Sequence, residues 1–219
     1  MDDFALRNDV LFRSLREFDT INQYANVYTT VTKGIKKLLK GRQLLQPLTI
    51  ADWACGCGET LRRIYEWAES QKIDVRLMGF DANPAVVEFA QKRTSYPQIE
   101  YYCQKVENIS GQKFDIIVAN SFLHHFNDDG IIRLFKKMRA QSNLGIVVSD
   151  WHRHPFLYYA ICYYTQWFSE SYITQYDGKL SILRGFVRKE LERMAVEGGW
   201  EKVEVSWEWA FHWLVVASK

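Results

Sequence analysis

The sequence predicts a single α/β domain built on a mostly parallel sheet, and three observations predict it. From Leu48 onward, short apolar runs alternate with segments of helical periodicity, which is the pattern of strands joined by crossover helices. The run at 75–80 is almost wholly apolar, as expected of a strand buried on both faces. The 219 residues suit one domain with a sizeable core and are few for two.

Residues 1–44 are predicted to form a helical cap ahead of the sheet. Two apolar stripes recur near the helical period, one at Leu11, Leu15, Phe18 and Ile21 and one at Val27, Val31, Ile35, Leu38 and Leu39. Gly41 ends the second stripe, and Asn22 and Tyr24 lie at the break between the two. We expect this segment either to cover a ligand or to pack as a plain helix pair.

Residues 45–150 are predicted to form the core of the domain. Strands are expected at 48–53, 75–80, 99–103, 114–119 and 145–149, and helices at 59–71, at 84–93 and after Asn127. The residues at or just past the ends of four strands are Asp52, Asp81, Asn120 and Asp150. Because ligands bind outside the carboxyl ends of parallel strands, we expect these four side chains to meet in one crevice.

Residues 155–180 hold a dense aromatic segment, which we interpret as a helical lid insertion. Its aromatic residues are Phe156, Tyr158, Tyr159, Tyr163, Tyr164, Trp167, Phe168, Tyr172 and Tyr176. Such side chains supply apolar area together with hydroxyls that can orient a ligand. Core packing or a homodimer interface is the alternative. Residues 181–219 are expected to form a helix and two antiparallel strands that close the sheet edge.

Composition argues against several classes of partner. A formal net charge of +2 is too near neutral to indicate nucleic acid or an anionic membrane as the main partner. No signal peptide and no apolar run of about 18 residues is found, so we expect a cytoplasmic protein without a membrane span. Cys55 and Cys57 lack a second pair at metal-ligand spacing, so no metal is expected.

The most informative stretch is the strand-to-helix turn after Asp52, which contains Ala54, Gly56 and Gly58. Glycines permit positive φ and let a ligand approach the backbone, and the following helix start offers unpaired N–H groups. Leu61 stands where a dinucleotide fingerprint needs its third glycine, which argues against NAD and FAD. A carboxylate, not lysine, follows Gly58, which argues against a phosphate loop for ATP or GTP.

The series from Asp52 to Gly58, Asp-Trp-Ala-Cys-Gly-Cys-Gly, closely resembles motif I of the class I S-adenosylmethionine-dependent methyltransferases, with Ala54 replacing the first glycine. The resemblance extends in motif order over residues 45–219. It implies a Rossmann-like seven-stranded methyltransferase sheet with an antiparallel C-terminal hairpin strand and helices on both faces. It also implies S-adenosylmethionine as cofactor and S-adenosylhomocysteine as product, with Asp52, Ala54, Gly56 and Gly58 contacting the cofactor.

Further cofactor contacts follow from the resemblance. Asp81, beside Ala82, matches the acid that binds the adenosine ribose, and a carboxylate there can accept hydrogen bonds from both ribose hydroxyls. Lys105 stands where the family usually has an aspartate for the adenine amino group, and lysine can only donate. We therefore expect adenine on the backbone around Val106 or on Gln104, and Asn120 nearby.

The later motifs resemble the small-molecule branch of the family, which includes quinone, phenol and polyketide methylators. Residues 114–121 resemble motif IV, and Leu-His-His follows at 123–125. The Asn-Pro-Pro-Tyr form is absent, which argues against methylation of amino groups in DNA or protein glutamine. The resemblance implies O-methylation of a small phenolic or polyketide-like acceptor, or C-methylation of a similar ring. A non-catalytic binding protein is the rival, and an RNA or protein methyltransferase is disfavoured by the charge.

Candidate catalytic and acceptor-binding residues come from the segments after two strands and from the lid. Histidine has a pKa of about 6.5, which suits removal of a phenolic proton. We favour His152, two residues past Asp150 and so able to be oriented by it, with His125 second. A structural role for each histidine is the alternative. Acceptor contacts are expected from the list Arg153, Tyr163 and Trp167.

Overall fold

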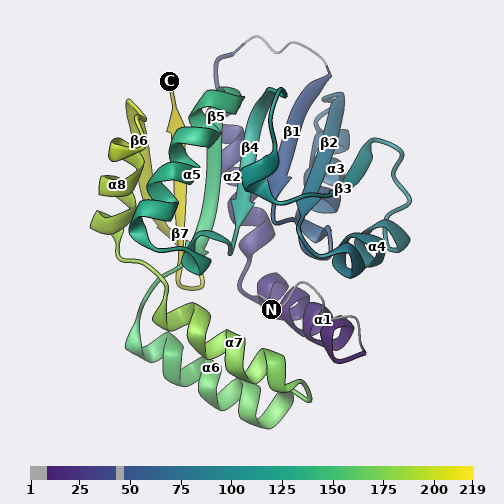
Figure 1. Cartoon of the computed structure of the whole chain (residues 1–219), viewed down its shortest axis with the longest axis vertical. Helices are drawn as coiled ribbons and strands as arrows, with labels where there is room; N and C mark the ends of the chain where they lie inside the picture. The colour runs from purple at the N-terminus through teal and green to yellow at the C-terminus, as the bar shows by residue number, and fades with distance from the viewer. Residues whose placement is uncertain (1–8, 43–46) are drawn as a thin grey trace.

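The computed structural model describes residues 9–42 and 47–219, and its centre is a seven-stranded sheet in the order β3-β2-β1-β4-β5-β7-β6 (Figure 1). The strands are β1 (Leu48–Trp53), β2 (Val75–Asp81), β3 (Ile99–Cys103), β4 (Phe114–Asn120), β5 (Ser142–Trp151), β6 (Lys202–Glu208) and β7 (His212–Ser218). β7 pairs antiparallel with β5 and with β6, and the other pairings are parallel. The predicted fold class, including the antiparallel C-terminal hairpin, is confirmed.

Eight α-helices are described around this sheet. They are α1 (Asp9–Tyr24), α2 (Val27–Leu39), α3 (Glu59–Ser70), α4 (Pro84–Lys92), α5 (Asp128–Gln141), α6 (Pro155–Phe168), α7 (Tyr172–Leu183) and α8 (Arg188–Glu197), with single 3-10 turns η1 (Val106–Asn108) and η2 (Leu123–His125). The two faces of the sheet bury separate apolar clusters: Ile50 lies in the cluster shared with α2 and α3, and Trp53 in the one shared with α5 and α8. Alternation along β1 thus supplies both cores.

Single asparagine side chains cap the N-termini of two crossover helices, α4 and α5. The Asn83 side chain accepts a hydrogen bond from the backbone N–H of Ala85 at 2.9 Å, and Pro84 occupies the first helical position of α4. Asn127 caps α5 in the same way, accepting from the N–H of Gly130 at 2.9 Å. Each helix therefore begins where its sequence offers an acceptor for an unpaired N–H.

Helices α6 and α7 form an antiparallel hairpin beyond the carboxyl ends of the strands, next to α1 (Figure 1). The sequence predicts that the lid ends at residue 180 and that the C-terminal helix begins at 181, and this boundary is wrong. α7 runs through Gly178 to Leu183, and α8 begins only at Arg188. Gly178 lies inside α7, where a Cβ would make an ordinary contact with Ile161 of α6 at 3.4 Å, and it does not form a turn.

Among the residues that the structure describes, no helix combines the length and apolar character needed to cross a membrane.

Candidate functional site

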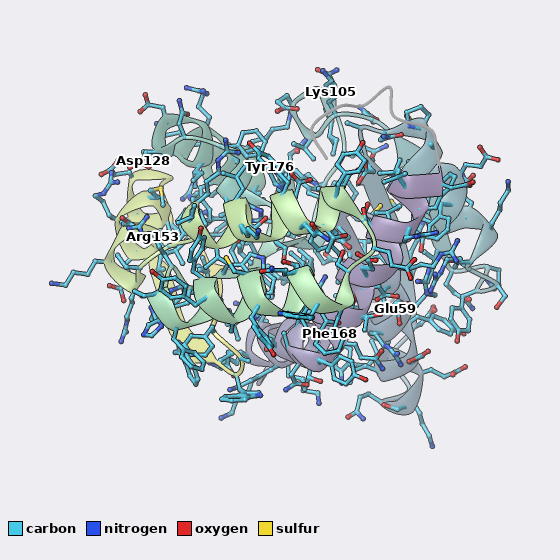
Figure 2. All side chains as sticks on the ribbon, turned by 90° about the horizontal axis from the view of Figure 1, so that it is seen from below. Glu59, Lys105, Asp128, Arg153, Phe168 and Tyr176 are labelled. Atoms are coloured by element: carbon cyan, nitrogen blue, oxygen red, sulfur yellow. The ribbon has the colours of Figure 1, made fainter. Side chains whose placement is uncertain are left out.

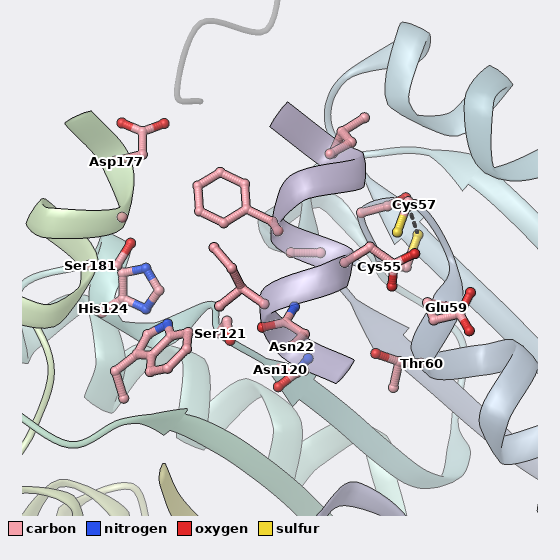
Figure 3. Close-up of a pocket in the computed structure, with 18 of the residues that line it drawn as sticks. Asn22, Cys55, Cys57, Glu59, Thr60, Asn120, Ser121, His124, Asp177 and Ser181 are labelled. Atoms are coloured by element: carbon pink, nitrogen blue, oxygen red, sulfur yellow. Dashed lines mark hydrogen bonds between the residues drawn. The ribbon is translucent and has the colours of Figure 1, made fainter. Parts of the chain in front are cut away.

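A pocket lies at the carboxyl ends of β1, β4 and β5, enclosed by α1 and by the α6–α7 hairpin (Figure 3). It is lined by Leu15, Phe18, Asp19, Ile21, Asn22, Tyr28, Ala54, Cys55, Gly56, Cys57, Glu59, Thr60, Asn120, Ser121, His124, His125, Trp151, Ile161, Asp177, Gly178, Ser181 and Ile182. Cap, core and hairpin each contribute to it. The sequence predicted the crevice at this end of the sheet and left open whether the N-terminal helices cover it; α1 does line it.

The glycine turn forms one wall of the pocket. Ala54, Gly56 and Gly58 have φ of 61°, 52° and 77°, the left-handed region that favours glycine, so Ala54 holds a strained conformation. A Cβ at Gly56 would meet no described atom within 4 Å, whereas one at Gly58 would overlap the hydroxyl of Tyr101. Gly56 therefore leaves open space where a ligand can approach, and Gly58 permits the packing behind the turn.

Asp81 holds this turn in place. Its carboxylate accepts hydrogen bonds from the backbone N–H of Gly56 at 3.1 Å and of Asn83 at 3.0 Å. Burial raises the pKa of Asp81, and these backbone donors, with Ala82, oppose the rise. Asp81 does not line the pocket itself, but it links the glycine turn to the start of α4.

Asp52 is buried beneath the turn, 1% exposed, and neither of its carboxylate oxygens has a hydrogen-bond partner. Burial, and then the charge of Asp81, raise the pKa of Asp52 well above its ordinary value. Of the four side chains expected to share a crevice, only Asn120 lines the pocket. Asp52 lies under the turn, and Asp150 lies behind His124.

Two polar atoms of the β4 end are buried in the pocket wall without a partner, Oδ1 of Asn120 and Oγ of Ser121. Buried polar atoms are normally hydrogen-bonded, so this pair is suited to a ligand that offers donors or acceptors. Asn120 was expected here from the sequence. Ser121 was not singled out, although its place directly after Asn120 at the strand end was an available signal.

His124 and Asp150 form a buried pair on the opposite wall. Nδ1 of His124 lies 2.7 Å from Oδ1 of Asp150, and the two side chains are 3% and 0% exposed. Burial alone would raise the pKa of Asp150, but His124 and the N–H of Trp151 outweigh it and lower the pKa. Because the ionised carboxylate can only accept, Nδ1 carries the proton, which leaves Nε2 of His124 as the nitrogen able to take a proton.

The expectation that Asp150 orients His152 is wrong, because the Asp150 carboxylate bonds His124. Residues two apart on a strand are separated by roughly 6.6 Å, whereas η2 brings His124 alongside the end of the neighbouring strand. His152 lies outside the pocket, its ring 4.9 Å from that of Trp213. Burial, and then His154, lower the pKa of His152. His125, the second candidate, does line the pocket, with its ring 4.3 Å from that of His124.

The three residues expected to contact an acceptor lie outside the pocket lining. Arg153 donates to the carbonyl of Gly185 at 3.1 Å and to Glu190 at 2.6 Å, in a groove on the far side of His124 and His125. Tyr163 and Trp167 are 65% and 68% exposed on the outer side of α6. None of these three residues therefore lies where it could contact an acceptor bound in the pocket.

The hairpin instead lines the pocket with a different set, Ile161, Asp177, Gly178, Ser181 and Ile182. Helical periodicity explains why Ile161 lines the pocket and Tyr163 and Trp167 do not. Ile161 of α6 lies on the side of the helix that faces the rest of the molecule, and the large aromatic residues occupy the opposite side. The aromatic content therefore predicted where the hairpin lies in the chain, but the aromatic residues themselves lie on its outer face and not in the pocket.

The pocket lining is acidic. It includes Asp19, Glu59 and Asp177, and among its described residues it contains no lysine or arginine. Asp19 accepts a hydrogen bond from the Tyr28 hydroxyl at 2.6 Å, and burial is the main cause of the raised pKa of Tyr28. Two of these carboxylates also form ion pairs with arginines outside the lining, Asp19 with Arg93 at 3.5 Å and Glu59 with Arg63 at 2.9 Å, which offset their charge. Within the described part of the chain, no cluster of three or more His, Cys, Asp or Glu side chains could hold a metal ion.

Comparisons with known proteins agree with this architecture. Residues 50–143 match a family described as a methyltransferase domain. A curated relative, malonyl-[acyl-carrier protein] O-methyltransferase of Acetivibrio thermocellus, is 29% identical over 102 residues, which cover 45% of this chain and 34% of the relative. The chain thus matches about a third of that relative's length.

Solved structures share the fold at low identity. Human N-acetylserotonin methyltransferase in complex with S-adenosylmethionine is 14% identical, covers 99% of this chain and 61% of its own, and has a TM-score of 0.66. Magnesium protoporphyrin IX methyltransferase from Synechocystis PCC 6803, with bound S-adenosylhomocysteine, is 14% identical, covers 91% and 87%, and has a TM-score of 0.60. Residues 50–143 therefore match a methyltransferase domain, and the chain shares the fold of these two methyltransferases, whose structures hold S-adenosylmethionine or S-adenosylhomocysteine.

Proposed function

We propose that this protein transfers the methyl group of S-adenosylmethionine to a phenolic or enolic oxygen of a small aromatic acceptor. The observation that carries the proposal is that the glycine turn and His124 line one pocket, with the buried Asp150 bonded to His124 from behind. The whole chain then acts as one methyltransferase domain, in which α1 and the α6–α7 hairpin cover the ligands.

The residues present fit the cofactor. Gly56 faces open space, so a ligand can approach the turn. The unpartnered atoms of Asn120 and Ser121 offer it hydrogen bonds. Asp81 remains the candidate for the ribose hydroxyls, and Ala82 and the backbone around Val106 for the adenine side. When bound, the cofactor supplies an electrophilic methyl group.

The acceptor half of the pocket is largely apolar. Phe18, Ile21, Trp151, Ile161 and Ile182 provide flat and aliphatic surface for a ring. No cationic side chain among the described lining residues would offset the charge of a carboxylate acceptor. A neutral aromatic acceptor is therefore favoured over an anionic one.

His124 is the base that the geometry supports. Asp150 holds the ring with its proton on Nδ1 and stabilises the imidazolium that forms when Nε2 takes a phenolic proton. A positioned base raises the rate about 100-fold to 10,000-fold. Alignment of the two ligands lowers the activation barrier by on the order of 7 to 11 kcal/mol. C-methylation of an electron-rich ring is the second candidate, because it uses the same pocket and the same base.

The test separates cofactor binding from catalysis. Calorimetry with S-adenosylhomocysteine should show binding, and incubation with S-adenosylmethionine and a panel of phenols and aromatic carboxylates should give a product 14 mass units heavier (roughly one CH₂) from the phenols. Binding without any product would support the non-catalytic rival. Absence of binding would overturn the proposal.

A further inference from the structure

The outer side of α6 carries a continuous aromatic stripe. Its members are Phe156, Tyr159, Tyr163 and Trp167, which follow one another at intervals of three and four residues and so share one helix face. Each is at least 65% exposed. The opposite face holds Leu157 and Thr165, both buried. The helix therefore presents its largest apolar side chains away from the molecule.

The stripe continues onto the turn between β6 and β7. The ring of Phe156 lies 5.8 Å from that of Phe211, which lies 5.9 Å from Trp207, and Trp207 lies 6.4 Å from Trp209. Trp207 and Trp209 are 44% and 65% exposed. We call the four stripe residues with these two tryptophans the aromatic face. Viewed from below, α6 and α7 form an outer layer across the end of the molecule, with Phe168 at its margin (Figure 2).

The aromatic face is large enough for a stable contact. Six aromatic side chains at these exposures present about 800 Å², which matches the roughly 800 Å² that each partner contributes to a standard protein interface. Monomeric proteins rarely expose contiguous apolar patches above a few hundred Å². This surface therefore has the size of one half of an interface.

The absence of charged residues from α6 indicates which kind of partner covers the aromatic face. α6 contains no acidic or basic residue, so a second copy would meet no like charge across a two-fold axis, where the same patch faces itself. Helices that lie on membranes carry lysine and arginine along their polar side, and α6 has none. Tyrosine and tryptophan are enriched at protein interfaces because they add polar groups to apolar area.

We propose that the aromatic face binds a second copy of this chain, forming a two-fold dimer through α6. The same helix supplies Ile161 to the pocket from its inner side. Dimerisation then holds the hairpin wall of the pocket against the core.

Sedimentation of the full chain between about 1 and 100 µM tests the proposal. The wild type should form a dimer, and Tyr163→Asp with Trp167→Asp should weaken it at least about tenfold, since each copy would then bury charge. Val196→Asp is the matched control, because Val196 is 61% exposed on α8, away from the aromatic face. Far-ultraviolet circular dichroism checks that the variants fold, and Tyr159→Arg replaces the double variant if it does not.

A wild type that stays monomeric at 100 µM overturns the proposal, as does a dimer that survives the double substitution. A monomer that binds phosphatidylcholine vesicles through Tyr163 and Trp167 also overturns it and assigns the aromatic face to a lipid surface.

Discussion

Nδ1 of His124 donates to the carboxylate of Asp150 at 2.7 Å, and both side chains are withdrawn from solvent at the wall of the pocket. The same carboxylate accepts from the backbone N–H groups of Leu123 at 2.8 Å and of Trp151 at 2.8 Å. These contacts fix both the position and the tautomer of the imidazole.

Replacing His124 should separate base catalysis from binding. His124→Gln should lower kcat for a phenolic acceptor by about 100-fold or more near pH 7, with recovery as the pH approaches the acceptor pKa, because the phenolate then forms without help. Asp150→Asn should lower kcat as well, since the amide can favour the other tautomer. His152→Gln is the control and should stay within about threefold, because His152 lies outside the pocket. Equal losses in the His124 and His152 variants would contradict the assignment.

Removing the charge of Asp52 should stabilise the fold. The folded-state pKa of Asp52 is raised by burial and by Asp81, so its stabilising contribution is complete below the unfolded pKa of about 3.9 and is lost as pH rises through the folded value. Asp52→Asn should therefore raise the free energy of unfolding at pH 7 by roughly 1 kcal/mol or more. Urea titrations of both proteins at pH 4 and pH 7 measure the free energy of unfolding. An equal gain at the two pH values would show that the ionisation of Asp52 is not its cause.

Asp81 should affect the cofactor more than the fold. Asp81→Asn keeps the size of the side chain and one of the two acceptors for Gly56 and Asn83, but it removes the charge proposed to bind the ribose. We expect S-adenosylhomocysteine binding to weaken by about 1.5 to 3 kcal/mol. Calorimetry checks this value. Glu197→Gln, exposed on α8, is the matched control and should leave the affinity unchanged; a similar loss there would point to a general charge effect.

Alanine at the two glycines of the turn should disturb different properties, chiefly stability at Gly58 and cofactor binding at Gly56. Gly58→Ala should lower the free energy of unfolding by about 1 to 3 kcal/mol, because the new methyl group would overlap Tyr101 at a position with positive φ. Gly56→Ala adds its methyl group to open space, so it should cost only about 1 to 2 kcal/mol from the left-handed backbone and should reduce cofactor binding. Thermal unfolding and calorimetry on both variants give the comparison, and intact cofactor affinity in Gly56→Ala would place the ligand elsewhere.

The sequence by itself determined the strands of the sheet, the order of strands and helices from β1 to β5, and the glycine turn. Local chemistry was sufficient there: an apolar strand ends at Asp52, glycines permit positive φ, and Asn83 and Asn127 cap the helices that follow. The same signals placed Asn120 and His125 at the pocket, since parallel strands end at one edge of a sheet.

Only the tertiary structure decided which side chains share the pocket. Asp150 bonds His124 and not His152, because its nearest neighbour lies across the sheet at the end of β4, while residues close along a strand are held apart by the extended backbone. The hairpin turns Ile161 inward and Tyr163 outward because packing against α1 and α7 selects one face of α6. α1 closes the pocket with Asp19 and Asn22 by a contact between segments far apart in the chain, which no local pattern encodes.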